Sequence, residues 1–126
     1  VSSRINSTWG GNLTDMVRSR RILEVVEADN LIERAGALGA VLLKQLQELA
    51  TRHTVVSEVR GRGLMCAFSL PDASTRDRVI ELLRTEEHVL ALGCGDAAVR
   101  FRPALTITEA ELTQAVDSID RVLGML

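Results

Sequence analysis

The 126-residue sequence is poor in cysteine, in lysine and in long apolar runs, and each shortage excludes a class of protein. Cys66 and Cys94 are the only cysteines, too few for a disulfide scaffold, which favours a reducing, cytoplasmic environment. No apolar run approaches the roughly 20 residues of a membrane span, and the N-terminus lacks the pattern of a signal peptide. The formal net charge of −2 argues against a nucleic acid or an anionic membrane as the partner.

The motifs of several common sites are missing as well. His53, His88 and the two cysteines lack the spacing of metal ligands, so no metal site is predicted. There is no Ser-His-Asp order, no nucleophile elbow, and neither a P-loop nor a dinucleotide fingerprint. Lys44, the only lysine among 15 basic residues, falls on the polar side of a predicted helix and is interpreted as a solubilising residue. From the residues alone, the chain is a ligand-binding domain without catalytic groups.

The composition and length of the sequence predict one globular domain. Hydrophobic residues make up 46% of the sequence and charged residues 25%, and 126 residues are enough to bury a core. The sequence begins at Val1 rather than with methionine, and its first dozen residues have no regular period. We therefore expect it to be a piece of a longer protein.

The hydrophobic spacing predicts four helices. The first is capped by Asn12 or Thr14 and carries an apolar stripe that includes Leu13, Met16 and Leu23. A break at Asp29-Asn30 precedes a long helix from Leu31 to about residue 52, whose inward stripe is Ala35, Leu38, Leu42, Leu46 and Leu49. In that helix Gly36 and Gly39 predict close packing on a neighbour. A third helix starts at 71–74, and a capping box of Thr108 and Glu111 starts the last.

Four strands are predicted between these helices. They lie at 55–60, at 64–70 with both faces covered, at 89–92 and at 99–102. A kink or bulge is expected at Arg60-Gly61-Arg62-Gly63. The order is helix, helix, strand, strand, helix, strand, strand, helix, which predicts an α+β fold: a small mixed or antiparallel sheet with helices packed on it.

The first candidate site is the segment 93–103, a glycine-containing mobile turn that leads into a strand. Alternation sends Val99 and Phe101 to one side and Arg100 and Arg102 to the other, and Pro103 ends the ladder. The arginine fork is shaped to hold a carboxylate or a phosphate. Alternation does not choose between the two arginines, and a solvated or salt-bridged strand face is the competing interpretation.

The second candidate is Ser7-Thr8-Trp9-Gly10-Gly11, just before the first helix. Hydroxyl groups and free amides at a helix N-terminus can receive a phosphate. The alternative is an ordinary capped helix entry.

Three segments together resemble the C-terminal part of class III (ω-amino acid) aminotransferases, which use pyridoxal phosphate. They are 6–12 (Asn-Ser-Thr-Trp-Gly-Gly-Asn), 59–64 (Val-Arg-Gly-Arg-Gly-Leu), and the Gly-Cys-Gly-Asp turn that runs into Arg-Phe-Arg-Pro at 100–103. The last is similar to the corresponding loop of 4-aminobutyrate aminotransferases and of bacterial lysine ε-aminotransferases, and the lysine group is the better match. The resemblance covers essentially the whole chain.

The resemblance implies roles for particular residues. Thr8 would bind the phosphate of pyridoxal 5'-phosphate across a homodimer, with Ser7 beside it and Asn6 lining the entrance. Arg100 would bind a substrate carboxylate, and Arg102 would be structural. Residues 1–28 would be a dimer-crossing cofactor loop and the helix that follows it, and 29–126 the small C-terminal domain of a fold-type I enzyme.

The chain departs from the family in lacking its Schiff-base lysine, which lies upstream of these residues, and Lys44 matches none of its contexts. The resemblance therefore implies an inactive fragment with no catalytic residue of its own. It would belong to an enzyme that moves the ε-amino group of L-lysine to 2-oxoglutarate, giving glutamate and a semialdehyde. The alternatives are a 4-aminobutyrate or ornithine aminotransferase and, in another class, a non-catalytic anion-binding α+β module.

Overall fold

The computed structural model describes residues 11–126 and divides into two units between Ile32 and Glu33. The first unit holds α1, and the second holds the sheet and the remaining helices. The elements are α1 (Leu13–Ala28), α2 (Leu31–Arg52), β1 (Ser57–Arg62), β2 (Met65–Ser69), α3 (Ala73–Thr85), β3 (Leu92–Cys94), β4 (Ala98–Arg100) and α4 (Glu109–Leu123). The predicted order of helices and strands is confirmed.

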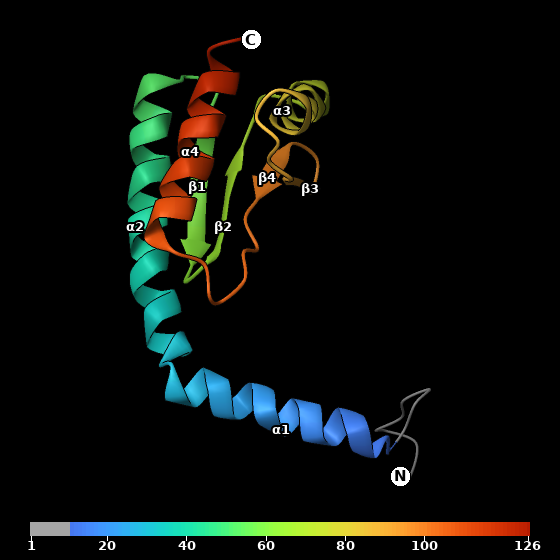
Figure 1. Ribbon diagram of the computed structural model, residues 1–126. Helices are drawn as coiled ribbons and strands as arrows, with labels where there is room; N and C mark the ends of the chain where they lie inside the picture. The colour runs from blue at the N-terminus through green and yellow to red at the C-terminus, as the bar shows by residue number, and fades with distance from the viewer. Residues whose placement is uncertain (1–10) are drawn as a thin grey trace, which may run out of the picture. The chain divides into compact units, whose positions relative to one another are not determined.

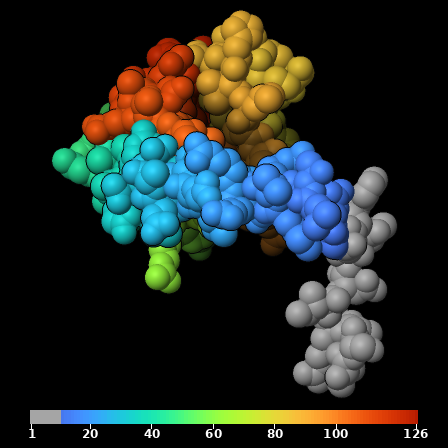
Figure 2. Space-filling model, turned by 60° about the horizontal axis from the view of Figure 1, so that its bottom comes forward, coloured from blue at the N-terminus to red at the C-terminus, as the bar shows by residue number. Residues whose placement is uncertain are grey.

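Helix α1 begins where the sequence predicts. The side-chain oxygen of Asn12 accepts hydrogen bonds from the backbone N–H groups of Thr14, at 2.9 Å, and Asp15, at 3.4 Å, so Asn12 rather than Thr14 is the N-cap. No residue of α1 is buried, and the apolar stripe is exposed, including Leu13 and Leu23. In the space-filling view the side chains of α1 (blue) stand on the surface (Figure 2).

The second unit is an antiparallel sheet with helices on one face. The strand order is β1-β2-β4-β3, and every neighbouring pair is antiparallel. Helices α2 and α4 lie side by side over the sheet, and α3 lies at the β3 and β4 end (Figure 1). The predicted α+β fold is confirmed.

One hydrophobic core fills the space between the helices and the sheet. It takes the predicted stripe of α2 and the inward faces of α3 and α4. From the strands and their ends it takes Val56, Leu64, Cys66, Phe68, Leu70 and Val99. Its fully buried large side chains are Phe68, Leu42, Leu46, Leu49, Leu83, Leu112, Ile119, Val79, Val99 and Val122. Each such aliphatic or aromatic side chain contributes about 1.5–3 kcal/mol by leaving water, so this layer holds the helices on the sheet.

Two strands are displaced from their predicted positions. The strand predicted at 55–60 is β1 at Ser57–Arg62, and the one predicted at 89–92 is β3 at Leu92–Cys94. Val56 and Val89 pack on the core from loops just outside the strands. At both places a β-branched residue packs on the core without pairing in the sheet, so its side chain gives the same sequence signal as a strand residue.

The glycine-rich segment between β1 and β2 is a hairpin turn rather than a kink. Arg62 pairs with Met65, which leaves Gly63 and Leu64 as the turn, and Gly63 has the left-handed φ of 54°. The irregularity lies upstream, where the register shifts between Ser57 and Arg60. The predicted bulge at 60–63 is thus wrong by two or three residues.

Strand β2 has only one face in the core. Cys66 and Phe68 are buried under the helices, while Ala67 and Ser69 are half-buried and Met65 is 69% exposed. The prediction that both faces are covered is wrong within the described part of the chain, because α2, α3 and α4 pack on the other side.

Glycine at position 39 is required by a close approach of α2 to the hairpin turn. A Cβ atom built on Gly39 would lie 2.2 Å from the carbonyl carbon and oxygen of Gly63. Gly36, three residues earlier, has no atom of residues 11–126 within 4 Å of such an atom. The predicted close packing is confirmed for Gly39 and is wrong for Gly36.

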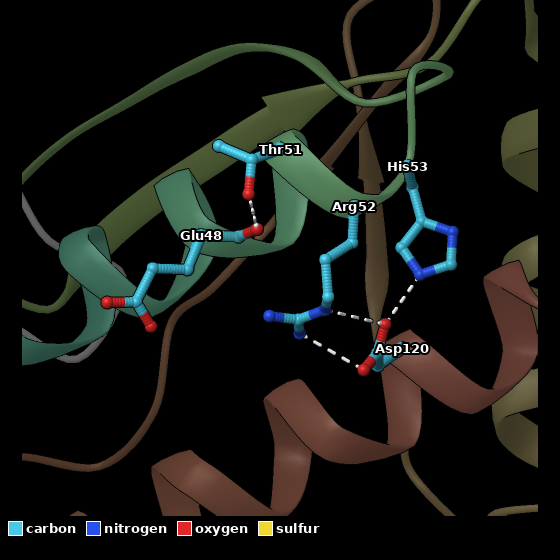
Figure 3. Close-up of polar contacts among 5 residues, drawn as sticks. All are labelled: Glu48, Thr51, Arg52, His53 and Asp120. Carbon is cyan, nitrogen blue, oxygen red and sulfur yellow. Dashed lines mark hydrogen bonds and ion pairs between the residues drawn. The ribbon is translucent and has the colours of Figure 1, made fainter.

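A polar cluster joins the C-terminal end of α2 to α4 (Figure 3). His53 Nε2 donates to Asp120 Oδ1 at 2.5 Å, and Arg52 donates to Asp120 Oδ2 at 3.0 Å. In the same turn the Thr51 hydroxyl donates to the Glu48 carbonyl at 2.7 Å. The hydrogen bond from His53, followed by that from Arg52, holds the pKa of the Asp120 carboxyl below its usual value.

We expect Asp120→Asn to destabilise the protein by on the order of 1 kcal/mol at neutral pH, the contribution of a hydrogen bond to a partly exposed charged group. A lowered folded-state pKa adds stability that is present above the ordinary value of about 3.9 and is lost as the pH falls through the lowered value. The difference in the free energy of unfolding between Asp120→Asn and the unmodified protein should therefore shrink below about pH 4. Unfolding midpoints measured from pH 7 to pH 3 test this, with Asp117→Asn, an exposed carboxylate on the same helix, as the control. A difference that persists unchanged at pH 3 would contradict it.

Candidate functional site

The strand pairing places the arginines of β1 and β4 on the face of the sheet that the helices do not cover. Because partners in register point to the same side, Phe68 and Val99 share the helix side, and Ala67 and Arg100 share the other. We call this second side the open face. Its members are Ser57, Arg60, Arg62, Met65, Ala67, Ser69, Leu92, Cys94, Ala98 and Arg100.

Arg100 lies at the end of β4, between two small or apolar neighbours. Its cross-strand partners are Ala67 on β2 and Leu92 on β3. The side chain is half-buried, and its Nε atom is buried with no hydrogen-bond partner within residues 11–126. A buried donor without an acceptor costs about 1–3 kcal/mol, more for a charged group, so this guanidinium is suited to an anionic ligand.

An apolar cavity of about 210 Å³ adjoins this strand end. Its lining includes Leu90 and Leu92 before the turn, Phe101 after Arg100, and Ile119 of α4. Aliphatic surroundings lower the local dielectric, which strengthens the attraction between a guanidinium and a carboxylate.

Arg102 differs from Arg100 in both position and exposure. The strand ends at Arg100, although the Phe101 N–H still donates to the Cys66 carbonyl at 2.7 Å and the Phe101 ring packs on the core. Arg102 is exposed, lies beyond the strand and, like Arg100, is among the residues that line the apolar cavity. The predicted alternation is confirmed through Phe101, whereas the predicted extension of the strand to residue 102 is wrong.

The glycine-containing turn before Arg100 is a short hairpin connection. Cys94 pairs with Ala98, which leaves only three residues in the loop, and Gly95 takes the left-handed φ of 54°. Arg76 of α3 covers Gly93 and donates from Nη1 to the Gly95 carbonyl at 3.3 Å. The register of β3 with β4 fixes the position of Arg100.

The two thiols have different surroundings. Cys66 is buried in the core, as predicted, and this burial raises the pKa of its thiol. Cys94 is half-buried at the open face, and no group of three or more His, Cys, Asp or Glu in residues 11–126 is arranged to hold a metal ion. Lys44 is exposed, as predicted, and lies 3.8 Å from Glu48.

A hydrogen-bonded cluster on the open face was not found from the sequence. Arg60 Nη1 donates to the Glu58 carbonyl at 2.7 Å and to Ser69 Oγ at 3.1 Å, and Ser69 Oγ donates to Glu58 Oε2 at 2.8 Å. Glu58 lies in the irregular part of β1, with a φ of 46°. Sequence spacing held no signal for this cluster, because it depends on that register shift.

The other predicted site residues, Asn6, Ser7 and Thr8, lie outside the described residues. The structure describes the helix that follows them, α1, from its N-cap Asn12 onward. No helix in residues 11–126 is long and apolar enough to cross a membrane.

Comparisons with known proteins point to one family. The family model described as Aminotransferase class-III matches residues 2–123. L-lysine-epsilon aminotransferase of Streptomyces clavuligerus is 52% identical over 94% of this chain and 26% of its own length. The mitochondrial 4-aminobutyrate aminotransferase of Sus scrofa is 36% identical over 84% of this chain and 21% of its own length.

Solved structures agree with these relatives. A lysine aminotransferase from M. tuberculosis superposes with a TM-score of 0.91 at 52% identity, over 99% of this chain and 29% of that one. An amine transaminase from an uncultivated Pseudomonas species, solved in its PLP-bound form, has a TM-score of 0.88 at 30% identity, over 98% and 30%. The chain thus spans less than a third of the length of the proteins it matches.

Proposed function

The chain belongs to the class-III aminotransferase family, and we propose that it is the C-terminal part of an enzyme that moves the ε-amino group of L-lysine to 2-oxoglutarate. This proposal rests on one observation: the sequence identity to lysine ε-aminotransferases is higher than the identity to 4-aminobutyrate aminotransferases. The lysine ε-aminotransferase is 52% identical over 94% of the chain, against 36% over 84% for the 4-aminobutyrate enzyme. The products are glutamate and the semialdehyde of the amino acid.

In this proposal Arg100 binds a substrate carboxylate. Its support is the buried Nε atom without a partner within residues 11–126, and the aliphatic cavity beside the strand end. An arginine fork holds a carboxylate through two parallel hydrogen bonds, which fixes the orientation of the substrate as well as its affinity. Asn6 would line the entrance of the same site.

Pyridoxal 5'-phosphate would supply the electron sink for the amino transfer. Ser7 and Thr8 carry hydroxyl donors suited to the cofactor phosphate, and in a homodimer they would serve the partner subunit's site. Lys44 is exposed on α2 and close to Glu48, so it fits a surface ion pair rather than a covalent link to the cofactor. The lysine that forms that link belongs to the rest of the enzyme.

The substrate assignment is tested with the intact protein, loaded with pyridoxal phosphate. We expect glutamate to form from L-lysine and 2-oxoglutarate with a kcat/KM at least tenfold higher than from 4-aminobutyrate or ornithine. A higher kcat/KM with 4-aminobutyrate or with ornithine would contradict the lysine assignment and would identify that amine as the substrate. No transfer from any of the three amines would favour the non-catalytic anion-binding module.

A further inference from the structure

An arginine in the first turn of α2 contacts the loop that joins β4 to α4. Arg34 Nη1 donates to the Leu105 carbonyl at 2.8 Å, and its Nη2 donates to the Ile107 carbonyl at 2.5 Å. These partners lie 71 and 73 positions away in the sequence. By contrast, Arg84 pairs with Glu81, three positions away in its own helix. The guanidinium of Arg34 thus bridges two backbone carbonyls of one distant loop.

This loop has few other contacts that fix its backbone. Residues 101–107 contain neither helix nor strand, and Pro103 has no N–H to donate. At the start of the loop the Phe101 N–H donates to a carbonyl of β2 at 2.7 Å. In Figure 1 the loop (orange) then leaves the sheet and returns to the start of α4. Within residues 11–126, the hydrogen bonds that tie the loop beyond Phe101 to another element are the two from Arg34.

The Arg34 side chain begins from a firmly packed part of α2. Ala35, the next residue, packs on the core, and Leu38, one turn further along, is buried in it. Gly39 lies directly against the backbone of Gly63 in the β1–β2 turn. A guanidinium is a planar fork that holds two acceptors in fixed positions. Because the helix backbone is held by these contacts, Arg34 fixes the loop relative to the sheet.

The loop held by Arg34 forms one wall of the apolar cavity beside Arg100. The cavity is lined by Arg100 and, from the loop, by Arg102, Pro103 and Ile107. A shift of Ile107 would therefore change the space next to the Arg100 guanidinium, while the pairing of β4 with its neighbours stays intact. Small displacements of the groups that position a substrate have large effects on its binding and reaction.

We propose that Arg34 is a positioning residue for substrate binding, which holds the loop of residues 101–107 as a wall of the cavity where Arg100 binds the carboxylate of 2-oxoglutarate. The inference rests on the proposed function, from which it takes the role of Arg100. Arg34 is half-buried and is not among the residues that line the cavity. It therefore acts through the loop and not by contact with the substrate.

Hydrogen exchange of the intact, folded protein tests the hold on the loop. Arg34→Ala should raise the exchange rate of the backbone amides of residues 104–107 by about tenfold, because the loop loses both bonds to α2. Arg52→Ala is the matched control, since it removes an arginine from the other end of α2 that contacts Asp120 at 3.0 Å. This control should leave exchange in the loop unchanged. An unchanged rate in Arg34→Ala, or an equal rise in both variants, would overturn the proposal.

Steady-state kinetics of the intact enzyme, loaded with pyridoxal phosphate, test the role in binding. Arg34→Ala should raise the KM for 2-oxoglutarate by about three- to tenfold and change kcat by less than about twofold, since a displaced wall weakens binding. Arg34→Lys keeps the charge without the planar fork, so its KM should lie between those of Arg34→Ala and the unmodified enzyme. Arg52→Ala should leave KM unchanged. A KM unaffected by Arg34→Ala, or raised equally by Arg52→Ala, would contradict the positioning role.

A failure of the proposed function is distinguishable from a failure of the role of Arg34. If the intact protein transfers no amino group from any of the three amines, the proposed function is wrong, and the variants are compared by their Kd for 2-oxoglutarate in titration calorimetry. Weaker binding in Arg34→Ala than in Arg52→Ala would support the positioning role, whereas equal Kd values or no binding to the unmodified protein would overturn it. If Arg34→Ala does not fold, Arg34→Gln is measured against Arg52→Gln, with smaller changes in the same directions expected.

Discussion

Replacing Arg100 with alanine is expected to raise the KM for 2-oxoglutarate by about 10- to 100-fold. The range follows from the loss of charge-assisted hydrogen bonds worth about 1.5–3 kcal/mol. Because Arg100 is half-buried at a strand end and makes no hydrogen bond through Nε in residues 11–126, the fold should lose little stability. Steady-state kinetics and thermal unfolding of the intact enzyme measure the two effects separately.

Two further variants sharpen this result. Arg100→Lys keeps the charge but loses the planar fork, so its KM should lie between those of the alanine variant and the unmodified enzyme. Arg78→Ala removes an exposed arginine from α3 and should leave KM unchanged. A KM for 2-oxoglutarate that is unaffected by Arg100→Ala would exclude Arg100 from the carboxylate site.

The second large effect is expected for Gly39→Ala, which should destabilise the protein by about 2–3 kcal/mol. The added methyl group would lie 2.2 Å from the backbone of Gly63, and neither the helix nor the hairpin turn can give way without repacking Leu38 and Leu42. This cost outweighs the roughly 1 kcal/mol by which alanine favours a helix over glycine.

Gly36→Ala is the matched control for Gly39→Ala, since it makes the same change three residues earlier in α2. Gly36 is exposed, and no atom of residues 11–126 lies within 4 Å of its added methyl group, so this variant should be more stable by up to about 1 kcal/mol. The midpoint of urea unfolding of the intact protein measures both changes. Shifts of the same sign for the two variants would contradict the close approach of α2 to Gly63.

The helix ends were predictable because their signals are local. The cap at Asn12 and the capping box of Thr108 with Glu111 use residues within three positions of one another. The inward stripe of α2 was predictable for the same reason, since spacing of three and four defines a helix face.

The strands were less predictable, because their positions depend on partners distant in the sequence. β-branched residues such as Val56 and Val89 pack on the core without pairing in the sheet. For this reason two strands were predicted two or three residues too early in the sequence. The exposure of Met65 could not be predicted at all. Alternation shows which residues share a face of a strand, but it does not show which face the helices cover.

The candidate site was predictable in part. The sequence located Arg100 on a strand face opposite Val99, and the pairing confirms that alternation. The partnerless Nε of Arg100 and the Glu58–Ser69–Arg60 cluster depend on tertiary packing, and local spacing has no signal for them. The roles of Asn6, Ser7, Thr8 and Arg100 stay predictions.

The strand order also has a consequence for how the protein assembles as it is synthesised. β4 is the last strand to be made, yet it lies inside the sheet between β2 and β3. Its pairing with β2 closes a loop that contains α3, so it forms more slowly than the local β1–β2 hairpin. A nascent chain therefore carries the β1–β2 hairpin and, once β4 is made, the β3–β4 hairpin, and the sheet is complete only when β4 pairs with β2. Mutations that weaken this pairing would be seen as low yield of folded protein before any effect on substrate binding could be measured.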